Sequence, residues 1–120
     1  MKLLGVAVPV FTGNIDAAIE RFGALTGEAV EFRFTIAELG MTIAKLGPIA
    51  LIAGEESAIA PLKNVRATFI VDSLADYEAH LRATGATILR PPGPTPVGKN
   101  MVARDLDGTV FEFVELRGRR

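Results

Sequence analysis

Hydrophobic positions in the first half of the chain follow a strand pattern and then a helix pattern. Residues 3–10 are continuously apolar and rich in valine, which is typical of a strand covered on both faces. Asn14 is a good helix cap, and Gly27 lies where a left-handed residue would end the helix. Between them, apolar residues recur at the spacing of one helical face: Ile15, Ala18, Ile19 and Phe22. Three strand-like segments follow at 29–39, 41–46 and 49–53.

The second half of the chain repeats this order of elements. Residues 54–64 begin with polar residues and contain Pro61, so they predict a linker with at most a short helical turn. Residues 65–71 predict a strand, and residues 72–73 can cap a second helix that ends at Gly85. The apolar face of this helix consists of Leu74, Tyr77 and Leu81. Three more strands are predicted at 86–90, 99–104 and 109–116.

Residues 91–96 contain four prolines and are predicted to form a loop, because proline cannot donate a backbone hydrogen bond to a sheet. This loop is a candidate lid over a pocket or a candidate contact between subunits. The alternative is a passive surface loop.

The order β-α-β-β-β therefore occurs twice, with equivalent elements about 60 residues apart. We predict an α+β fold in which two βαβββ modules form a curved mixed sheet around a concave pocket. The chain is expected to be a single domain of residues 1–120, with module 1 at 1–54, a linker at 55–64 and module 2 at 65–120.

Composition narrows the classes of function. The net charge of -1, from 13 basic and 14 acidic residues, argues against a nucleic-acid partner, which needs a basic face. Cysteine is absent, so disulfides and thiolate metal sites are excluded. No apolar segment is long enough to span a membrane, and the apolar start is too short for a secretion signal. We expect a cytoplasmic protein whose partner is a small molecule.

Residues 102–116, VARDLDGTVFEFVEL, resemble the closing signature of the vicinal-oxygen-chelate superfamily. This group includes glyoxalases, bleomycin-resistance proteins and extradiol dioxygenases. Its usual Asp-Pro-Asp-Gly turn occurs here as 105–108 with Leu106 in place of proline. Residues 5–10 and 14–22 also resemble the first strand and helix of the family. The resemblance covers nearly the whole chain and implies the fold. It says little about the reaction or the ligand, because one fold hosts many chemistries.

The resemblance also implies four positions for metal ligands, one on each of four strands. These positions fall on Gly5, on or near Ala50, on Arg66 and on Glu112. Only Glu112 has the expected kind of donor atom, and a catalytic divalent metal ordinarily needs about three protein ligands. We therefore expect no metal cofactor, with a divalent metal as the disfavoured alternative.

Glu112 lies between Phe111 and Phe113, so strand alternation points it away from the apolar face that meets the helix. It is a candidate catalytic or ligand-binding carboxylate; the alternatives are a solvated strand residue and a metal ligand. Arg66 is placed on the same face by the alternation of residues 67, 69 and 71. We predict an ion pair between Arg66 and Glu112, either as simple charge compensation or with Arg66 binding an anionic or carbonyl group of a ligand.

Three further residues are candidate walls of the ligand pocket: Phe34, Met41 and Met101. The sequence leaves open which face of strand 29–39 lines that pocket. His80, the only histidine, is expected on the surface, and Tyr77 in the core.

Two classes of function are compatible with these residues. The first is metal-independent binding of a small organic molecule, which the bleomycin-resistance branch represents. The second is an enzyme that uses Glu112. It is either a glyoxalase-like lyase or isomerase with Glu112 as a general base, or a dioxygenase-type, metal-dependent member with unusual ligands. The resemblance implies a homodimer, and a module that works only inside a larger assembly is a third possibility.

Overall fold

The computed structural model describes residues 1–118, so the last two residues of the second predicted module lie outside the described part. The chain forms two compact units, and each is described by itself. Unit 1 comprises Met1–Val6 together with the chain from Val65 onward, and unit 2 comprises Ala7–Asn64. The first residues of the chain are thus part of the unit formed by the second half.

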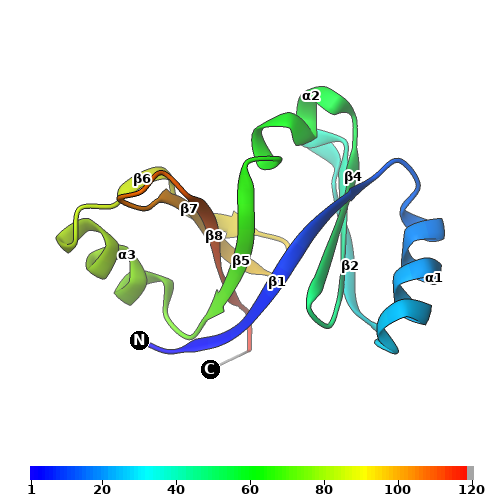
Figure 1. Ribbon diagram of the computed structural model, residues 1–120, viewed down its shortest axis with the longest axis horizontal. Coiled ribbons are helices and arrows are strands. Elements are labelled where there is room, and N and C mark those ends of the chain that lie inside the picture. Colours follow the sequence, from blue (N-terminus) through cyan, green and yellow to red (C-terminus); the bar gives the residue numbers. More distant parts are fainter. Residues whose placement is uncertain (119–120) are drawn as a thin grey trace. The chain divides into compact units, whose positions relative to one another are not determined.

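Unit 2 is a mixed sheet with one helix on one of its faces (Figure 1). Its elements are the later part of β1 (Leu3–Thr12), α1 (Ile15–Thr26), β2 (Val30–Ile36), β3 (Met41–Leu46) and β4 (Ile49–Gly54). The strand order is β2-β3-β4-β1, in which β1 and β4 are parallel and the other pairs antiparallel. A short helix α2 (Glu56–Ile59) and a 3-10 turn (Ala60–Leu62) complete the unit.

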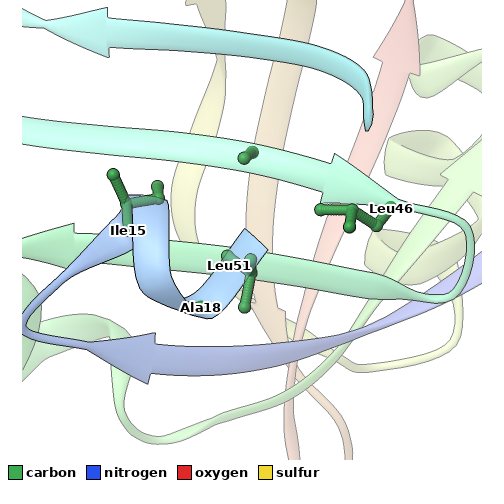
Figure 2. Close-up of a cluster of buried hydrophobic side chains, with 5 residues drawn as sticks. Ile15, Ala18, Leu46 and Leu51 are labelled. Carbon is green, nitrogen blue, oxygen red and sulfur yellow. The ribbon is translucent and has the colours of Figure 1, made fainter. Parts of the chain in front are cut away.

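Helix α1 is positioned by its caps and by the core beneath it. The Asn14 side chain accepts a hydrogen bond from the N–H of Ala17 at 3.1 Å, and Gly27 ends the helix with a φ of 73°. Figure 2 shows Ile15 and Ala18 of the helix beside the buried strand residues Leu46 and Leu51. Both predicted ends of this helix are confirmed.

Unit 1 is built in the same way. Its elements are β5 (Val65–Val71), α3 (Leu74–Ala83), β6 (Thr87–Thr95), β7 (Gly98–Arg104) and β8 (Val110–Leu116), in addition to the start of β1. The strand order is β1-β5-β8-β7-β6, with β5 and β8 parallel and β6, β7 and β8 antiparallel. Helix α3 lies against β6, β7 and β8 (Figure 1).

The core under α3 contains Val71, Leu74, Met101, Ala103 and Phe113. The Oε1 atom of Glu115 accepts a hydrogen bond from the N–H of Leu74 at 2.8 Å. A carboxylate from β8 therefore satisfies one of the free amides at the start of α3, where the helix dipole favours negative charge.

The prediction of an α+β fold with two βαβββ modules is confirmed. Within residues 1–118, no helix is long and apolar enough to cross a membrane. The turn at 105–108 also forms as predicted, since Asp105 Oδ1 accepts the N–H groups of Asp107 and Thr109.

The prediction of an irregular loop at 91–96 is wrong, because β6 continues through Pro91, Pro92 and Pro94 to Thr95. Strand β6 is the outer strand of its sheet, so one of its edges needs no hydrogen-bond donors. The pairing with β7 shifts register between Ile88 and Arg90 and again between Arg90 and Gly93. These irregularities accommodate Pro91 and Pro92 without breaking the strand. In a smaller difference, β2 ends at Ile36, before a 3-10 turn at Ala37–Leu39.

The carboxylate of Asp72 attaches the start of β1 to unit 1. Its Oδ1 accepts the N–H of Lys2 at 2.8 Å, and its Oδ2 lies 3.9 Å from the amino group of Met1. The hydrogen bond from Lys2 lowers the pKa of Asp72 from its ordinary value of 3.8, against an opposing effect of desolvation. The positive amino terminus contributes in the same direction as Lys2.

We expect Asp72 to make its full contribution to folding stability at pH values above its ordinary pKa of 3.8. This contribution should disappear as the pH falls through the lowered pKa of Asp72 in the folded protein. The reason is that the ionised carboxylate is the form that binds Lys2. The measurement is the difference in Tm between the wild type and Asp72→Asn as the pH is lowered from about 7 to about 2. This difference in Tm should shrink on acidification. Asp107→Asn, which changes an exposed carboxylate, is the control and should show no such trend. A difference that stays constant with pH would contradict the stabilising role of ionised Asp72.

Candidate functional site

The candidate site lies on the face of unit 1 that is opposite α3. Phe111 and Phe113 pack in the core under α3, and Glu112 between them is directed to the other face, as strand alternation predicts. In the sheet, Glu112 pairs with Thr68 of β5 on one side and with Val102 of β7 on the other. Glu112 is therefore in the middle of a row of residues that crosses three strands.

Two neutral side chains hold the Glu112 carboxylate. Thr68 Oγ1 donates to Oε1 at 2.8 Å, and Asn100 Nδ2 donates to Oε2 at 2.9 Å. Thr68 and Asn100 are buried, and Glu112 is half-buried. We call these three residues the Glu112 centre. Each carboxylate oxygen accepts one hydrogen bond here and keeps a second lone pair that is free for a ligand.

The neighbours of the Glu112 centre on the same face are mainly aliphatic. Val110 and Val114 lie two residues on either side of Glu112, and Ile70 pairs with Val114. A Cβ at Gly5 would lie 3.8 Å from the Cδ1 of Ile70, so the start of β1 borders this face. The carboxylate and its two polar partners are therefore bordered by aliphatic side chains of β5 and β8, which favours a ligand that is partly apolar.

The predicted ion pair between Arg66 and Glu112 is wrong. Among the ion pairs within residues 1–118, none joins these two side chains, and Arg66 is exposed. The reason is a register shift in β5: Val65 pairs with Val110, and Ala67 pairs with the very next residue, Phe111. Arg66 is thus the extra residue of a β-bulge, which alternation along the sequence does not reveal.

Two other arginines share the face of Glu112. Arg90 pairs with Val102, which in turn pairs with Glu112, and Arg104 pairs with Val110. Both arginines are exposed, and neither forms an ion pair in the part of the chain that the structure describes.

Two buried side-chain oxygens, one in the Glu112 centre and one on β6, have no hydrogen-bond partner. They are Oδ1 of Asn100 and Oγ1 of Thr95. Gly93 pairs with Asn100 across β6 and β7, and Thr95 lies two residues further along β6 on the same face. Buried acceptors without donors are rare in folded proteins and call for an explanation.

In unit 2, the register of β2 shows which of its residues lie on the face opposite α1 and which lie on the α1 face. Phe34 pairs with Ile43 on the face opposite α1, where it stacks on Phe32 with ring centroids 5.9 Å apart. Arg33 is on the α1 face and donates to Asp16 at 2.6 Å. Phe34 thus remains a candidate ligand contact, whereas Met41 on the same face is 4% exposed and packs with Ile52 and Ile59.

Met101 does not belong to the face of Glu112. It is 0% exposed and packs under α3 beside Leu74 and Phe113. Its neighbours in β7, Asn100 and Val102, point to the other face, so alternation directs Met101 into the core. The prediction that Met101 forms a wall of the ligand pocket is therefore wrong.

A buried lysine is the main polar feature that the sequence analysis missed in unit 2. Lys45 Nζ donates to Glu31 Oε2 and to the carbonyl oxygen of Gly47, both at 2.8 Å, and its side chain is 10% exposed. The signal in the sequence was the single charged residue in the strand segment 41–46. Thr68 and Asn100 were missed for a different reason, since only the pairing of distant strands brings them to Glu112.

The other candidate acids and bases, His80 and Tyr77, lie away from the Glu112 face. His80 is exposed on α3, as predicted. Tyr77 contacts the core, where burial raises the pKa of its phenol and the negative charge of Asp72 adds to the effect. Within residues 1–118, no group of three His, Cys, Asp or Glu side chains could hold a metal ion.

Solved structures show what this chain is similar to. A hypothetical protein from Methanosarcina mazei is 38% identical over 100% of this chain and 98% of its own, with a TM-score of 0.90. This chain belongs to the same family as that protein. Neither a protein-family model nor a curated protein matches the chain.

More distant structures share the fold. The methylmalonyl-CoA epimerase of Mycobacterium tuberculosis is 20% identical, covers 95% of this chain and 89% of its own, and has a TM-score of 0.76. A variant of the Streptomyces coelicolor enzyme, in complex with 2-nitronate-propionyl-CoA, is 18% identical over 99% of each chain, with a TM-score of 0.77. These epimerases are vicinal-oxygen-chelate proteins, so the fold that the sequence motif implies is confirmed.

Proposed function

We propose that this protein binds a small, partly apolar organic molecule at the Glu112 face without a metal ion. The observation that carries this proposal is the half-buried carboxylate of Glu112, which Thr68 and Asn100 hold in one orientation among aliphatic residues. A fixed acceptor in an apolar surrounding is the usual design of a small-molecule site. The ligands named for the epimerase structures are consistent with a small-molecule role for this fold.

The donor atoms around Glu112 do not fit the divalent metal that the fold family implies. A cation needs oxygen or nitrogen lone pairs that converge on it, whereas Thr68 and Asn100 direct hydrogens at the carboxylate. The other two family positions in unit 1 are Gly5, which has no side-chain donor, and the cationic Arg66. We therefore assign the recognition of the ligand to the protein's own side chains.

The free lone pairs of Glu112 should accept a hydrogen bond from an O–H or N–H group of the ligand. A hydrogen bond to a charged group is worth about 1.5–3 kcal/mol, so its loss should weaken binding by roughly 10- to 100-fold. We expect this loss in Glu112→Leu, and a smaller one in Glu112→Gln, which keeps an acceptor oxygen. The measurement is calorimetric titration with a compound selected in a thermal-shift screen of aromatic and carbonyl metabolites.

Two controls sharpen this test. Glu56→Gln changes an exposed carboxylate in unit 2 and should leave the affinity unchanged. A chelator should also leave the wild-type affinity unchanged, because no metal takes part. The proposal is refuted if binding survives in Glu112→Leu, or if the chelator abolishes it and the purified protein carries a stoichiometric divalent ion.

An isomerase is the second candidate function, favoured by the structural likeness to methylmalonyl-CoA epimerases. Glu112 would act as a general base for a proton next to a carbonyl group. Incorporation of solvent deuterium into methylmalonyl-CoA, lost in Glu112→Gln, would support this candidate. Recovery of the bound compound unchanged, with no deuterium, would support the binding function.

The homodimer and the cytoplasmic location also remain proposals. Light scattering of the purified protein tests the first, and the location of a tagged chain tests the second.

A further inference from the structure

We propose that Arg90 and Arg104 together bind an oxyanion, so that the ligand of the Glu112 face is an organic anion, either a carboxylic acid or a phosphate ester. This inference rests on the proposed function, because it names the class of ligand that the Glu112 face takes. Both arginines belong to unit 1 and lie on the face of its sheet that carries Glu112. The anionic group of the ligand would contact the two guanidinium groups, and its apolar part the aliphatic residues beside Glu112.

A register shift in β6 turns Arg90 toward this face. Ile88 packs in the core under α3, and the two-residue period of a strand would direct Arg90 into the same core. The pairing with β7 shifts between these two residues instead, and Arg90 pairs with Val102, whose neighbour on β8 is Glu112. The shift leaves Leu89 44% exposed. The strand therefore exposes an apolar side chain at the point where it presents a charged one to the Glu112 face.

Strand β5 adds a third cation at the same end of the sheet. Arg66 is the extra residue of its bulge and directly follows Val65. Val65 pairs with Val110, and Val110 pairs with Arg104. Bulges occur often beside functional sites, where they redirect a side chain. Because β8 lies between Arg66 and Arg104, Arg66 contributes positive charge at this end of the sheet rather than a direct contact with the anion.

The spacing of Arg90 and Arg104 suits a single anion. Arg104 lies two residues along β7 from Val102, so it is the diagonal neighbour of Arg90 across the two strands. Diagonal neighbours on one face lie about 7–8 Å apart, a distance that long side chains can bridge. Each guanidinium group offers parallel N–H donors that match the oxygens of a carboxylate or a phosphate. Two such groups at this spacing can converge on one oxyanion.

The guanidinium groups at this end of the sheet are not neutralised by the protein itself. The arginines elsewhere in residues 1–118 each have a partner in an ion pair, a hydrogen bond or a ring contact: Arg21, Arg33, Arg82 and Arg117. Within the same residues, Arg66, Arg90 and Arg104 form no ion pair and no side-chain hydrogen bond. The donors without a partner are thus gathered where the two bulges lie.

Glu112 is held apart from these arginines. Its oxygens accept from Thr68 on β5 and from Asn100, which lies on β7 on the opposite side of Val102 from Arg104. The carboxylate therefore keeps an acceptor for the ligand, and the arginines keep their donors. The strands β6 and β8 are two spacings apart, or about 10 Å, which a small metabolite can span. The ligand should therefore carry an anionic group at one end and an O–H or N–H group that reaches Glu112.

The test titrates the ligand-free full chain, labelled with ¹⁵N, with sodium phosphate and with sodium acetate at constant ionic strength. The Nε–H signals of Arg90 and Arg104 should shift together and saturate with one affinity. The variants Arg90→Gln and Arg104→Gln should each weaken this affinity about 10-fold, through the loss of hydrogen bonds between charged groups. Tighter binding of phosphate indicates a phosphate ester as the ligand, and tighter binding of acetate a carboxylic acid.

Arg33 and Arg82 are internal controls for this titration, because each already has a carboxylate partner. Their Nε–H signals should stay in place. The proposal is overturned if the signals of Arg90 and Arg104 do not move, or if the arginine signals all move equally, since the anion would then only screen charge.

Thermal melts give a second measurement. Phosphate should raise the Tm of the wild type above its value in chloride at equal ionic strength, because it binds the folded state. This rise should disappear in the double variant Arg90→Gln/Arg104→Gln, which changes only exposed side chains, and persist in Arg82→Gln on α3. A rise that survives in the double variant would place the anion elsewhere and refute the proposal. Because the probes are inorganic phosphate and acetate, failure here is distinct from failure of the proposed function, which would appear as absent binding of organic compounds in the calorimetric titrations.

Discussion

Replacement of Lys45 with methionine should lower the free energy of unfolding by about 3 kcal/mol. Methionine preserves the length and the apolar stem of lysine, so packing against the neighbouring strands is largely retained. What is lost is the ammonium group, which donates to Glu31 Oε2 and to the carbonyl oxygen of Gly47 at 2.8 Å each. The Lys45 side chain is 10% exposed and that of Glu31 30%, so the loss leaves a partly desolvated carboxylate without its cation and the Gly47 carbonyl oxygen without this donor. This loss costs more than that of an exposed pair.

The local structure makes this loss cooperative. The N–H of Gly47 also donates to Glu31 Oε2, at 3.0 Å, so the lysine, the glutamate and the turn between β3 and β4 form a closed ring. The ring joins β2 to that turn. It does so at Glu31, where the pairing of β2 with β3 shifts register between Val30 and Phe32. Weakening it should also increase hydrogen exchange in β2, the outer strand of unit 2.

Chemical denaturation followed by circular dichroism measures this effect. The matched control is Lys63→Met, since Lys63 pairs with Glu56 at 2.9 Å with side chains that are 45% and 72% exposed. An exposed pair contributes about 0–1 kcal/mol, so the control should unfold nearly as the wild type does. Equal losses in the two variants would show that burial does not strengthen the Lys45 pair.

The parts of the fold that the sequence predicted correctly depend on local rules. The helix caps at Asn14 and Ser73 require only that a side chain reach an amide within the next few residues. The orientation of Glu112 follows from the two-residue period of its own strand. Each of these features is determined within a few positions, so one sequence suffices to find it.

The errors at the candidate site arise where distant strands meet. A single extra residue in β5 moved Arg66 out of the ladder and placed Thr68 opposite Glu112. No local pattern contains that shift, because it is a property of the pairing with β8. Likewise, proline within β6 is acceptable only because β6 has one free edge, which depends on the order of all the strands in the unit.

Replacement of Gly98 with alanine should be the second most damaging change, at about 3 kcal/mol. A Cβ at this position would overlap the backbone carbonyl oxygen of Glu115 and would lie 3.1 Å from the backbone nitrogen of Arg117. Both obstacles are main-chain atoms of or next to β8, and the N–H of Arg117 is fixed by the carbonyl oxygen of Val97 at 2.8 Å. Relief therefore requires β7 and β8 to move apart at this end.

The position of Gly98 links this stability effect to the Glu112 centre. Asn100 lies two residues further along β7, and its amide reaches Glu112 on β8 at 2.9 Å. Separation of the two strands should lengthen this contact, so the Asn100 side-chain NH₂ signal should shift toward that of a solvated amide. Loss of ligand affinity should accompany the fall in Tm, although Gly98 itself has no side chain to touch a ligand.

Gly93→Ala provides the matched control for this prediction, since it makes the same change on the facing strand. Gly93 pairs with Asn100, but a Cβ there would lie 3.9 Å from the carbonyl oxygen of Pro91, an ordinary contact. Thermal melts and the Asn100 NH₂ signal should therefore remain close to wild type in Gly93→Ala and change together in Gly98→Ala. If Gly98→Ala lowered Tm while the Asn100 signal stayed in place, the Glu112 centre would be held independently of the β7–β8 spacing. In that case Thr68 on β5, rather than Asn100, would be the residue that fixes the carboxylate.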